Sequence, residues 1–238
     1  MMLADILSSL FPAGHDVRND GGVVTGTGNL KASSMQVIGV AGRTALGVDE
    51  AIRLSGHVLA SSASGSILVV VDSDSQRMSK RDELMGLNEF LAHMAKCLIQ
   101  ADLQGRPTVG LLYGHSAAGA FLATALATRV LVGLPPGADP VVMDLPSMSK
   151  VTKLPLEVLQ EKAKSTPVFA PGLANLAQTG AVHLTWDPAR PLSGQLETLL
   201  ADLPSYGDNR DALGKERGGR PKAHDIAERV RTLALQMP

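Results

Sequence analysis

The order of hydrophobic and polar residues divides the middle of the chain into alternating strand and helix patterns. Ser66–Asp72 contains five consecutive branched apolar residues, which is typical of a strand buried on both faces of a sheet. Pro107–Tyr113 is a second apolar run behind a Gly-Arg pair, and it predicts another buried strand. Asp82–Gln100, between the two, carries apolar residues at helical spacing. This alternation predicts a layered α/β fold.

The same pattern predicts shorter elements on both sides of this region. The predicted strands are Gly21–Thr27, Ser34–Val40, Arg129–Gly133 and Ala181–Trp186. The predicted helices are Met2–Leu10, Asp49–Ala60, Leu156–Ala163, Ala174–Thr179, Gly194–Leu203 and His224–Leu235. The predicted loops are Gly42–Val48, Ser73–Lys80, Pro135–Pro146 and Arg210–Lys222. Because none of these loops is a strong break, the sequence predicts one domain over residues 1–238, with residues 193–238 as a C-terminal helical appendage.

Seven small or polar residues, Gly114–Ala120, join the second buried strand to a predicted helix at Phe121–Thr128. A strand, a tight turn and a helix in this order expose backbone N–H groups at the start of the helix, and those groups favour negative charge. Gly119 and Ala120 have minimal side chains, so an oxygen atom can approach their N–H groups closely. The sequence therefore predicts that this turn stabilises a developing oxyanion.

An oxyanion site of this kind needs a second donor from another loop. The polar segment Asp72–Arg77 follows the strongest predicted strand. Loops that leave the carboxyl ends of neighbouring parallel strands converge on one crevice. The segment is therefore a candidate for the second wall of the site, and the alternative interpretation is a solvated connector.

Composition narrows the classes of function. Of the 238 residues 45% are apolar and only 3% are aromatic, which favours closely packed helix-on-sheet layers. The net charge of −1 provides no field that attracts nucleic acid or an anionic membrane. The single cysteine, Cys97, cannot form an intrachain disulfide, and no stretch reaches about 18 uninterrupted apolar residues. We therefore expect a cytoplasmic protein with no nucleic-acid or membrane partner, and no metal site, since no His/Cys cluster has metal-ligand spacing.

The turn has two other interpretations. Gly114–Ala118 is similar to the G-x-S-x-G elbow of serine hydrolases, with Ala118 in place of the second glycine. Such an enzyme needs an acid and then a histidine after Ser116. The acids available are Asp139, Asp144 and Asp187, and the later histidines are His183 and His224. Neither histidine lies in a Gly-flanked loop. In the second interpretation, the small residues serve only close packing of a helix on a strand.

Several segments together resemble a carboxyltransferase half of the crotonase superfamily. They are Gly39-Val40-Ala41-Gly42 with Gly47, Ile67–Asp72, Arg106-Pro107-Thr108-Val109 and Gly114–Ala120. Within that superfamily the chain most resembles the gamma subunits of biotin-independent malonate decarboxylases. The segments Met143–Thr152 and Pro167–Gly172 are similar to those subunits too. The resemblance covers most of residues 20 to 190.

The resemblance implies a crotonase-like (ClpP/crotonase) spiral of ββα units that pairs with a homologous beta subunit around a shared active site. It also implies an acyl carrier subunit and an acyl-transferase subunit as further partners. The implied substrate is a malonyl thioester on the phosphoribosyl-dephospho-coenzyme A arm of the acyl carrier protein, with no permanently bound cofactor and no biotin partner. The implied activity is that of a carboxy-lyase, which releases CO2 and leaves an acetyl thioester.

The resemblance also assigns roles to residues. In the family a Gly-Gly-Ala turn at the head of a helix supplies an oxyanion hole, and Ala118-Gly119-Ala120 matches it with one substitution. Apart from the resemblance, His115 or Ser116 is a candidate to polarise the carboxylate or protonate the enolate carbon, and the alternative for each is a core or turn-capping role. Candidate substrate-binding residues are Gly47, Ser75 and Gln76. Candidates for the phosphates of the carrier arm are Arg43, Arg77, Lys80, Arg81, Lys150 and Lys153. Three classes stay open: a decarboxylase subunit, a serine hydrolase using Ser116, and a non-catalytic scaffold for a homologous partner.

Overall fold

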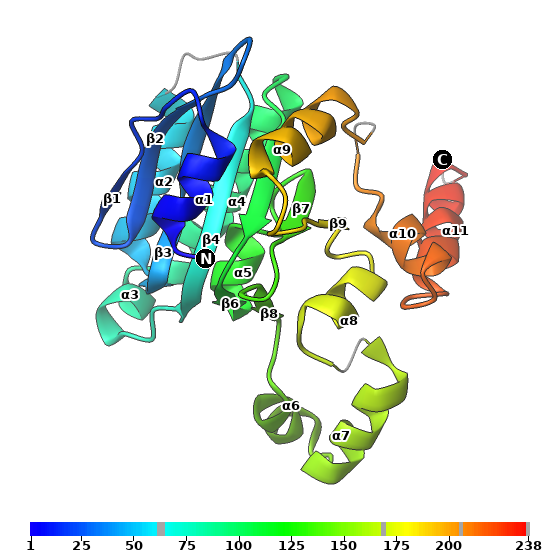
Figure 1. The fold of residues 1–238 in the computed structure, drawn as a ribbon. Helices are drawn as coiled ribbons and strands as arrows, with labels where there is room; N and C mark the ends of the chain where they lie inside the picture. Colours follow the sequence, from blue (N-terminus) through cyan, green and yellow to red (C-terminus); the bar gives the residue numbers. More distant parts are fainter. Residues whose placement is uncertain (61–64, 168–169, 205–206, 237–238) are drawn as a thin grey trace. The chain divides into compact units, whose positions relative to one another are not determined.

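The computed structural model describes residues 1–60, 65–167, 170–204 and 207–236. Their contacts form two compact units (Figure 1). The first unit is Met1–Val142 with Leu184–Tyr206, and the second is Met143–His183 with Gly207–Pro238. The organisation as one domain with residues 193–238 as an appendage stays a prediction. Val168 and Phe169, within the Pro167–Gly172 segment of the resemblance, lie outside the described residues.

Strands and helices alternate along the first unit as the hydrophobic pattern predicts. Its strands are β1 (Arg18–Asp20), β2 (Val23–Asn29), β3 (Ser34–Leu46), β4 (Ile67–Gln76), β5 (Thr108–Leu112), β6 (His115–Ala117), β7 (Val130–Gly133), β8 (Asp139–Val141) and β9 (Leu184–Thr185). Its helices are α1 (Leu3–Leu10), α2 (Val48–Ala60), α3 (Lys80–Leu84), α4 (Leu87–Leu103), α5 (Ala118–Ala123) and α9 (Leu192–Ala201).

Within the described residues, a seven-stranded sheet has the order β1-β2-β3-β4-β5-β7-β9. The first three strands pair antiparallel, and β3, β4, β5, β7 and β9 pair parallel. β6 and β8 form a separate parallel pair. The β2–β3 hairpin and the buried strands β4, β5 and β7 confirm the corresponding predictions. Of the predicted strand Ala181–Trp186, only Leu184–Thr185 is extended.

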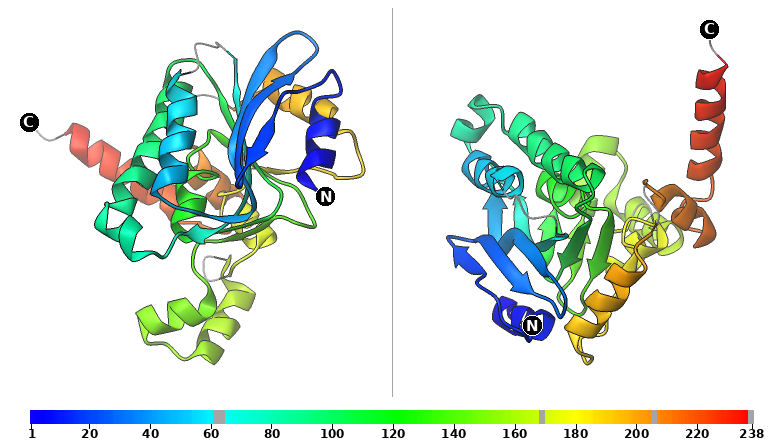
Figure 2. Two further views of the ribbon diagram at one scale, coloured as in Figure 1. Left: turned by 90° about the vertical axis from the view of Figure 1, so that its left-hand side faces the viewer. Right: turned by 90° about the horizontal axis from the view of Figure 1, so that it is seen from above.

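Helices cover both faces of the main sheet, because every residue of the central strands must be buried. Ile67–Val71 at the start of β4 is wholly buried, as its continuous apolar run predicts. Alternate residues of the strands pack against α1 and α9, as Leu68 and Val70 do beside Leu10 and Leu196. Figure 2 shows α2 and α4 on the opposite face of the sheet from α1 and α9. The sheet therefore holds a rigid core from which the ends of β3 and β4 project.

The two segments expected to be loops after the central strands are strand instead, so this prediction was wrong. β3 continues through the predicted loop Gly42–Val48 as far as Leu46, and β4 continues through Ser73–Gln76. The two extensions pair with each other at Thr44↔Ser73 and Leu46↔Gln76, with register shifts. Most of their residues are polar or small, so no hydrophobic pattern marked them as strand.

Three other predicted boundaries are wrong for local reasons. The long helix Asp82–Gln100 is two helices, α3 and α4, because Gly86 takes the left-handed φ of 84° between them. The helix predicted at Phe121–Thr128 begins earlier and ends at Ala123. The Pro-rich loop Pro135–Pro146 contains β8, which pairs with β6 through backbone hydrogen bonds rather than through an apolar pattern.

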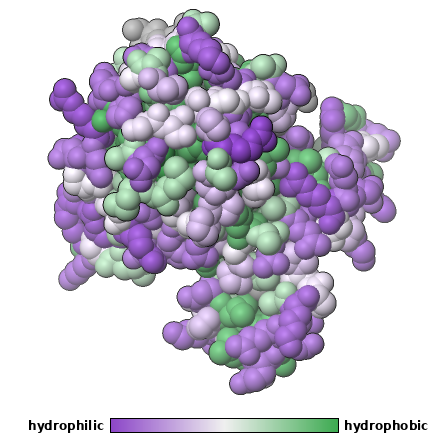
Figure 3. Space-filling view, viewed as in Figure 1, coloured by the Kyte–Doolittle hydropathy of each residue, from purple (hydrophilic) through white to green (hydrophobic). Residues whose placement is uncertain are grey.

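The second unit consists of helices in the described residues: α6 (Leu145–Thr152), α7 (Leu156–Ser165), α8 (Leu173–Gln178), α10 (Arg210–Glu216) and α11 (Ala223–Leu235). The predicted connector Arg210–Lys222 is wrong, since α10 lies within it. In Figure 3 apolar surface appears over α6 and α7, where Val151 and Val158 are exposed. None of the helices in the described chain is long and apolar enough to cross a membrane.

Candidate active site

Asp72, which follows the apolar run Ile67–Val71 in β4, holds two neighbouring chain segments by hydrogen bonds. Its Oδ1 accepts the backbone N–H of His115 at 3.2 Å, and its Oδ2 accepts the backbone N–H of Gly42 at 3.0 Å. A Cβ at Gly114 would lie 2.1 Å from Asp72 Oδ1, so only glycine allows this approach. The Asp72 carboxylate thus connects β6, and the bend of β3 at Gly42, to β4.

Beyond Asp72, β6 lies along the extension of β4. The Ser116 and Ser73 hydroxyls hydrogen-bond at 2.8 Å, and both residues are fully buried. The Ser116 side chain is therefore committed to the interior, on the face of β6 that contacts β4. This contact explains the serine in the turn as a packing and hydrogen-bonding residue.

The backbone reverses at Ala118, where the strand becomes helix. Ala117 is extended, with φ −130° and ψ 155°, and Ala118 takes a φ of +48°, which is uncommon for a residue with a Cβ. A glycine at this position, as in the Gly-Gly-Ala turn of the resemblance, would be free of that strain. α5 then runs for only six residues, so its dipole is small and the individual N–H groups matter more.

The Gly119 N–H is directed at an oxygen from the neighbouring segment. It donates to the Gln76 side-chain carbonyl oxygen, Oε1, at 2.9 Å. A Cβ at Gly119 would lie 3.1 Å from that oxygen and 3.2 Å from Leu91 Cδ1, so the glycine faces a confined space. Ala120 is fully buried beside it. The predicted convergence of the turn with the segment Asp72–Arg77 is therefore present, through Gln76.

His115 projects from β6 toward β8. Its Nδ1 lies 2.8 Å from Asp139 Oδ2, and the two residues are cross-strand partners in the β6–β8 register. The exposed fraction is 17% for the His115 side chain and 57% for that of Asp139. The His115 ring is therefore held by a hydrogen bond at Nδ1 and remains partly exposed to solvent. Asp139, considered in the sequence only as an acid for a hydrolase, is bonded to His115 instead.

The other two predicted substrate-binding residues lie near Gln76 but bond elsewhere. Ser75 Oγ donates to the backbone carbonyl of Gln76 at 3.1 Å. The Gly47 N–H donates to Glu50 Oε2 at 3.0 Å, and a Cβ there would meet Arg77 and Asp82 within 3 Å. Gly47 thus leaves room for an ion-pair cluster beside the end of β4.

That cluster engages two of the basic residues predicted for phosphate binding. Arg77 pairs with Glu50 and lies 3.6 Å from the buried carboxylate of Asp82. Arg81 pairs with Asp49 at 2.8 Å, and its hydrogen bond holds the pKa of that carboxyl below its usual value. Arg77 and Arg81 are thus neutralised by carboxylates within the chain. Of the other four candidates, Arg43 and Lys80 are in the first unit, and Lys150 and Lys153 are on or next to α6 in the second.

The residues of a hydrolase triad are not joined in the described part of the chain. His183 bonds Asn209 at 3.1 Å, and burial lowers its pKa. His224 bonds Asp211 at 2.9 Å, and both histidines lie in the second unit. Cys97 is buried, and burial raises the pKa of its thiol. The Ser116 hydroxyl and both imidazoles are thus each bonded to a residue outside the hypothetical triad.

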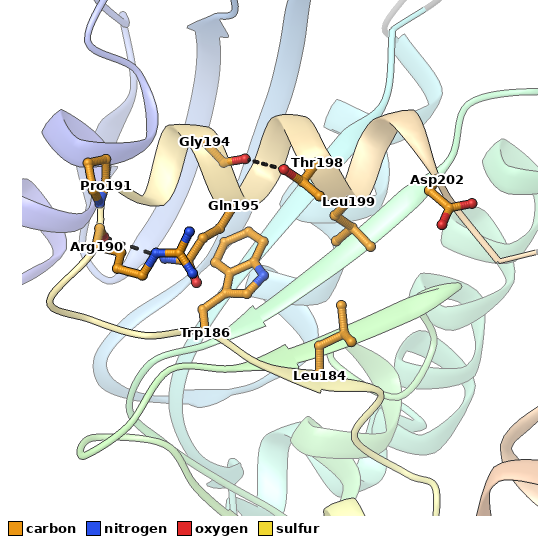
Figure 4. A pocket seen from close by; sticks show the side chains of 9 residues that line it. All are labelled: Leu184, Trp186, Arg190, Pro191, Gly194, Gln195, Thr198, Leu199 and Asp202. Atoms are coloured by element: carbon orange, nitrogen blue, oxygen red, sulfur yellow. Dashed lines mark hydrogen bonds between the residues drawn. The ribbon is translucent and has the colours of Figure 1, made fainter.

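A cavity of about 470 Å³ lies elsewhere in the first unit, between β9 and α9. Figure 4 shows apolar side chains of Leu184, Trp186 and Leu199 in its lining, with Arg190 and Asp202 near its two ends. None of the predicted site residues lines it. No group of His, Cys, Asp and Glu in the described chain is placed to hold a metal ion.

The chain is similar to known proteins in sequence and in structure. The family model described as malonate decarboxylase gamma subunit matches residues 41–234. A curated relative, the malonyl-S-ACP:biotin-protein carboxyltransferase MADD of Malonomonas rubra, is 30% identical over 169 residues. That alignment covers 65% of this chain, which spans 57% of the length of the relative.

Solved structures are similar over nearly the whole chain. A Pseudomonas malonate decarboxylase hetero-tetramer in complex with coenzyme A contains a chain with TM-score 0.77 and 23% identity, with 97% of each chain covered. The Pseudomonas MdcD-MdcE hetero-dimer gives TM-score 0.73 at 22% identity, over 97% of this chain and 96% of that one. Transcarboxylase 12S gives TM-score 0.68 at 16% identity, over 87% of this chain and 42% of the other. The predicted crotonase-like carboxyltransferase fold is confirmed.

Proposed function

Because this chain belongs to the malonate decarboxylase gamma subunit family, we propose that it takes part directly in releasing CO2 from a malonyl thioester. The substrate in this proposal is carried by an acyl carrier protein on a phosphoribosyl-dephospho-coenzyme A arm, and the product is the acetyl thioester. The reaction class is that of a carboxy-lyase.

The observation that carries this proposal is the hydrogen bond from the Gly119 N–H to Gln76 Oε1. An amide carbonyl oxygen is the same kind of acceptor as a thioester oxygen, so the turn already holds a neutral stand-in for the substrate. A thioester oxygen that displaces Gln76 would take over this N–H, together with that of Ala120. When CO2 leaves, negative charge collects on that oxygen and strengthens the contact. Losing one such donor typically costs about 3–4 kcal/mol of barrier.

The hydrogen bonds around β6 hold the Gly119 and Ala120 N–H donors in position before substrate arrives. Asp72 fixes β6 through the His115 N–H, and Ser73 fixes it again through Ser116. The turn therefore does not have to reorganise when charge develops, which is the condition for efficient electrostatic stabilisation. When substrate binds, the Gln76 side chain gives up its hydrogen bond to the Gly119 N–H and becomes available to a neighbouring substrate atom.

The proposed partners are a homologous beta subunit, an acyl carrier subunit and an acyl-transferase subunit. Support for the first comes from the similar MdcD-MdcE hetero-dimer of Pseudomonas. Support for a carrier-bound thioester comes from the name of the Malonomonas rubra relative, which specifies malonyl-S-ACP. In this proposal the active site is shared with the beta subunit, which supplies a second oxyanion hole.

A second candidate function is carboxyl transfer to a biotin protein, because the Malonomonas rubra relative is named for that reaction. The first step would be the same, since carboxyl transfer also passes through an enolate at the thioester. The two candidates differ in the fate of the carboxyl group, which is either released as CO2 or captured by biotin.

The test of the proposed function is to express the partner subunits with and without this chain and to measure CO2 release from malonyl-loaded carrier protein. We expect release only when this chain is present, with no requirement for a biotin protein and no inhibition by avidin. Inhibition by avidin would favour the second candidate. Equal CO2 release without the chain would contradict both.

Replacing Ser116 with alanine separates a decarboxylase from a serine hydrolase. We expect the Ser116→Ala complex to keep most of its CO2 release, because the hydroxyl bonds Ser73 in the interior. The change should lower stability by about 1 kcal/mol, through loss of one buried hydrogen bond. Loss of essentially all turnover, in a variant that still assembles, would point to a nucleophilic serine. The measurements are CO2 release and the midpoint of urea unfolding.

A further inference from the structure

We propose that His115 and Asp139 form the pair that protonates the enolate after CO2 has left, with His115 as the catalytic acid and Asp139 as a positioning residue. The inference deepens the proposed function and depends on it, because an enolate must first form at the Gly119 turn. It assigns to this chain the source of the proton that completes the reaction.

The geometry of the pair is that of an oriented imidazole. The 2.8 Å bond from His115 Nδ1 to Asp139 Oδ2 joins directly opposed residues of two paired strands. The backbone N–H of His115 is held separately by Asp72 Oδ1. Ring and main chain are thus each fixed by a carboxylate from a different strand. With Nδ1 bonded to Asp139, Nε2 is the ring nitrogen left to exchange a proton with a substrate.

The His115 ring lies on the face of β6 that does not contact β4, close in sequence to the turn. Side chains alternate along β6, so His115 lies on the opposite face from Ser116, whose hydroxyl is bonded to Ser73 in the interior. The 17% exposure of the His115 side chain leaves its ring accessible. A strand advances about 3.3 Å per residue, so only about 7 Å of extended chain separate His115 from the start of the turn at Ala117.

Four other titratable groups of these segments, those of Asp72, Tyr113, Arg77 and Arg81, are paired or buried. Both oxygens of Asp72 accept backbone N–H groups. The Tyr113 phenol is buried, and burial together with the charge of Asp72 raises its pKa, which makes it a poor acid. Arg77 and Arg81 are paired with carboxylates. The imidazole of His115 differs from these groups, because it keeps one ring nitrogen outside the bond to Asp139 and is partly exposed.

The proposed step balances in atoms and charge. The bond between the carboxylate carbon and the methylene carbon of the malonyl group breaks, CO2 departs, and the electron pair forms the enolate. The enolate carbon then takes the Nε2 proton of the His115 imidazolium, forming a C–H bond as the N–H bond breaks. The neutral imidazole regains a proton from water, while Asp139 keeps its bond to Nδ1 throughout.

The experiment uses the assembled complex and two assays. The first assay measures net acetyl thioester formation from malonyl-loaded carrier. The second follows deuterium incorporation into the methyl group of acetyl-loaded carrier in D2O, which runs the protonation step backward without any CO2. We expect His115→Gln to lower both rates at least about 100-fold, the scale of a lost general acid. Asp139→Asn should lower both about tenfold and Asp139→Glu should restore part of the loss, because glutamate keeps the negative charge that stabilises the imidazolium.

Exchange of labelled CO2 into the malonyl thioester separates this inference from the proposed function. In His115→Gln the enolate still forms, so label exchange should persist while acetyl formation falls. If labelled CO2 exchange disappears together with acetyl formation, His115 acts before the proton transfer and the inference is overturned. If wild-type rates persist in both assays, it is overturned as well. A failure of the proposed function would instead appear in the wild-type complex, as no CO2 release at all.

A matched control is available within the chain. His224 and Asp211 form an imidazole–carboxylate pair of nearly the same length, 2.9 Å, between α10 and α11. His224→Gln should leave both assays at the wild-type rate. Nitrogen-15 spectra of the His115 ring test positioning directly, because Asp139→Asn should change which ring nitrogen carries the proton. An unchanged ring spectrum in that variant would remove Asp139 from the role.

Discussion

Replacement of Gly119 by valine is expected to lower CO2 release by about 10²- to 10³-fold, the effect of losing an oxyanion-hole donor. Even a Cβ at this position would lie 3.1 Å from Gln76 Oε1 and 3.2 Å from Leu91 Cδ1. The two further methyl groups of valine must occupy the space in front of the N–H, where the proposal places the thioester oxygen. The substitution is therefore expected to block the donor while leaving the sheet and the core intact.

The measurement is CO2 release from malonyl-loaded carrier by the purified complex, beside the amount of variant chain that co-purifies with its partners. Gly194→Val is the matched control, because it also puts valine into the first turn of a helix, α9, where a Cβ meets nothing within 4 Å. We expect the control to work at the wild-type rate. Normal turnover in Gly119→Val would remove the turn from the mechanism and favour a scaffold role for this chain.

Replacement of Gly39 by alanine is expected to give the largest loss of stability, about 3–5 kcal/mol, which places it among the severe single substitutions. Gly39 has a φ of +154° and pairs with Val70 between β3 and β4. A Cβ there would lie 1.9 Å from the Val70 carbonyl oxygen. Because that oxygen belongs to the backbone of the central strand, the strands must separate or shift. Such a shift would also disturb the bond from Gly42 to Asp72 at the site.

Urea unfolding of the purified chain measures this effect, and Gly56→Ala is its control. Gly56 is inside α2, and a Cβ there meets nothing within 4 Å. Alanine should therefore stabilise the chain by about 0.5–1 kcal/mol through its higher helix propensity. The two Gly→Ala changes are thus expected to have opposite signs. A Gly39→Ala chain as stable as the wild type would show that β3 and β4 are not packed at this contact.

The cavity between β9 and α9 and the proposed chemistry are at different places in the first unit. The cavity between β9 and α9 has a mostly apolar lining and contains none of the residues that meet at the Gly119 turn. The sequence did not predict this cavity, because its lining comes from residues 184 to 202, where no motif appears. The comparisons extend across this region, since the family model matches as far as residue 234.

The loop predicted after the apolar run of β4, at the edge of the site, was wrong for a physical reason. Hydrophobic periodicity detects strands that are covered by other layers, and Ile67–Val71 is covered on both faces. Ser73–Gln76 continues the same strand with polar residues, which pair with β3 through the backbone and bond β6 and α5 through the Ser73 and Gln76 side chains. The prediction that these residues form a loop was wrong for that reason. Gln76 does contact the turn, but its side-chain oxygen accepts the Gly119 N–H, and the expected second donor from this segment stays a prediction.

What the sequence alone determined is the set of local structures. Branched apolar runs define the buried strands, helical spacing defines α2 and α4, and small residues between Gly114 and Ala120 allow the backbone to bend closely against its neighbours. What only the tertiary structure decided is which polar atoms meet. Gln76 and Gly119 are 43 residues apart, and His115 and Asp139 are 24 apart. Such contacts depend on the register between strands and on the direction of each side chain, and neither is encoded in the local pattern of either segment.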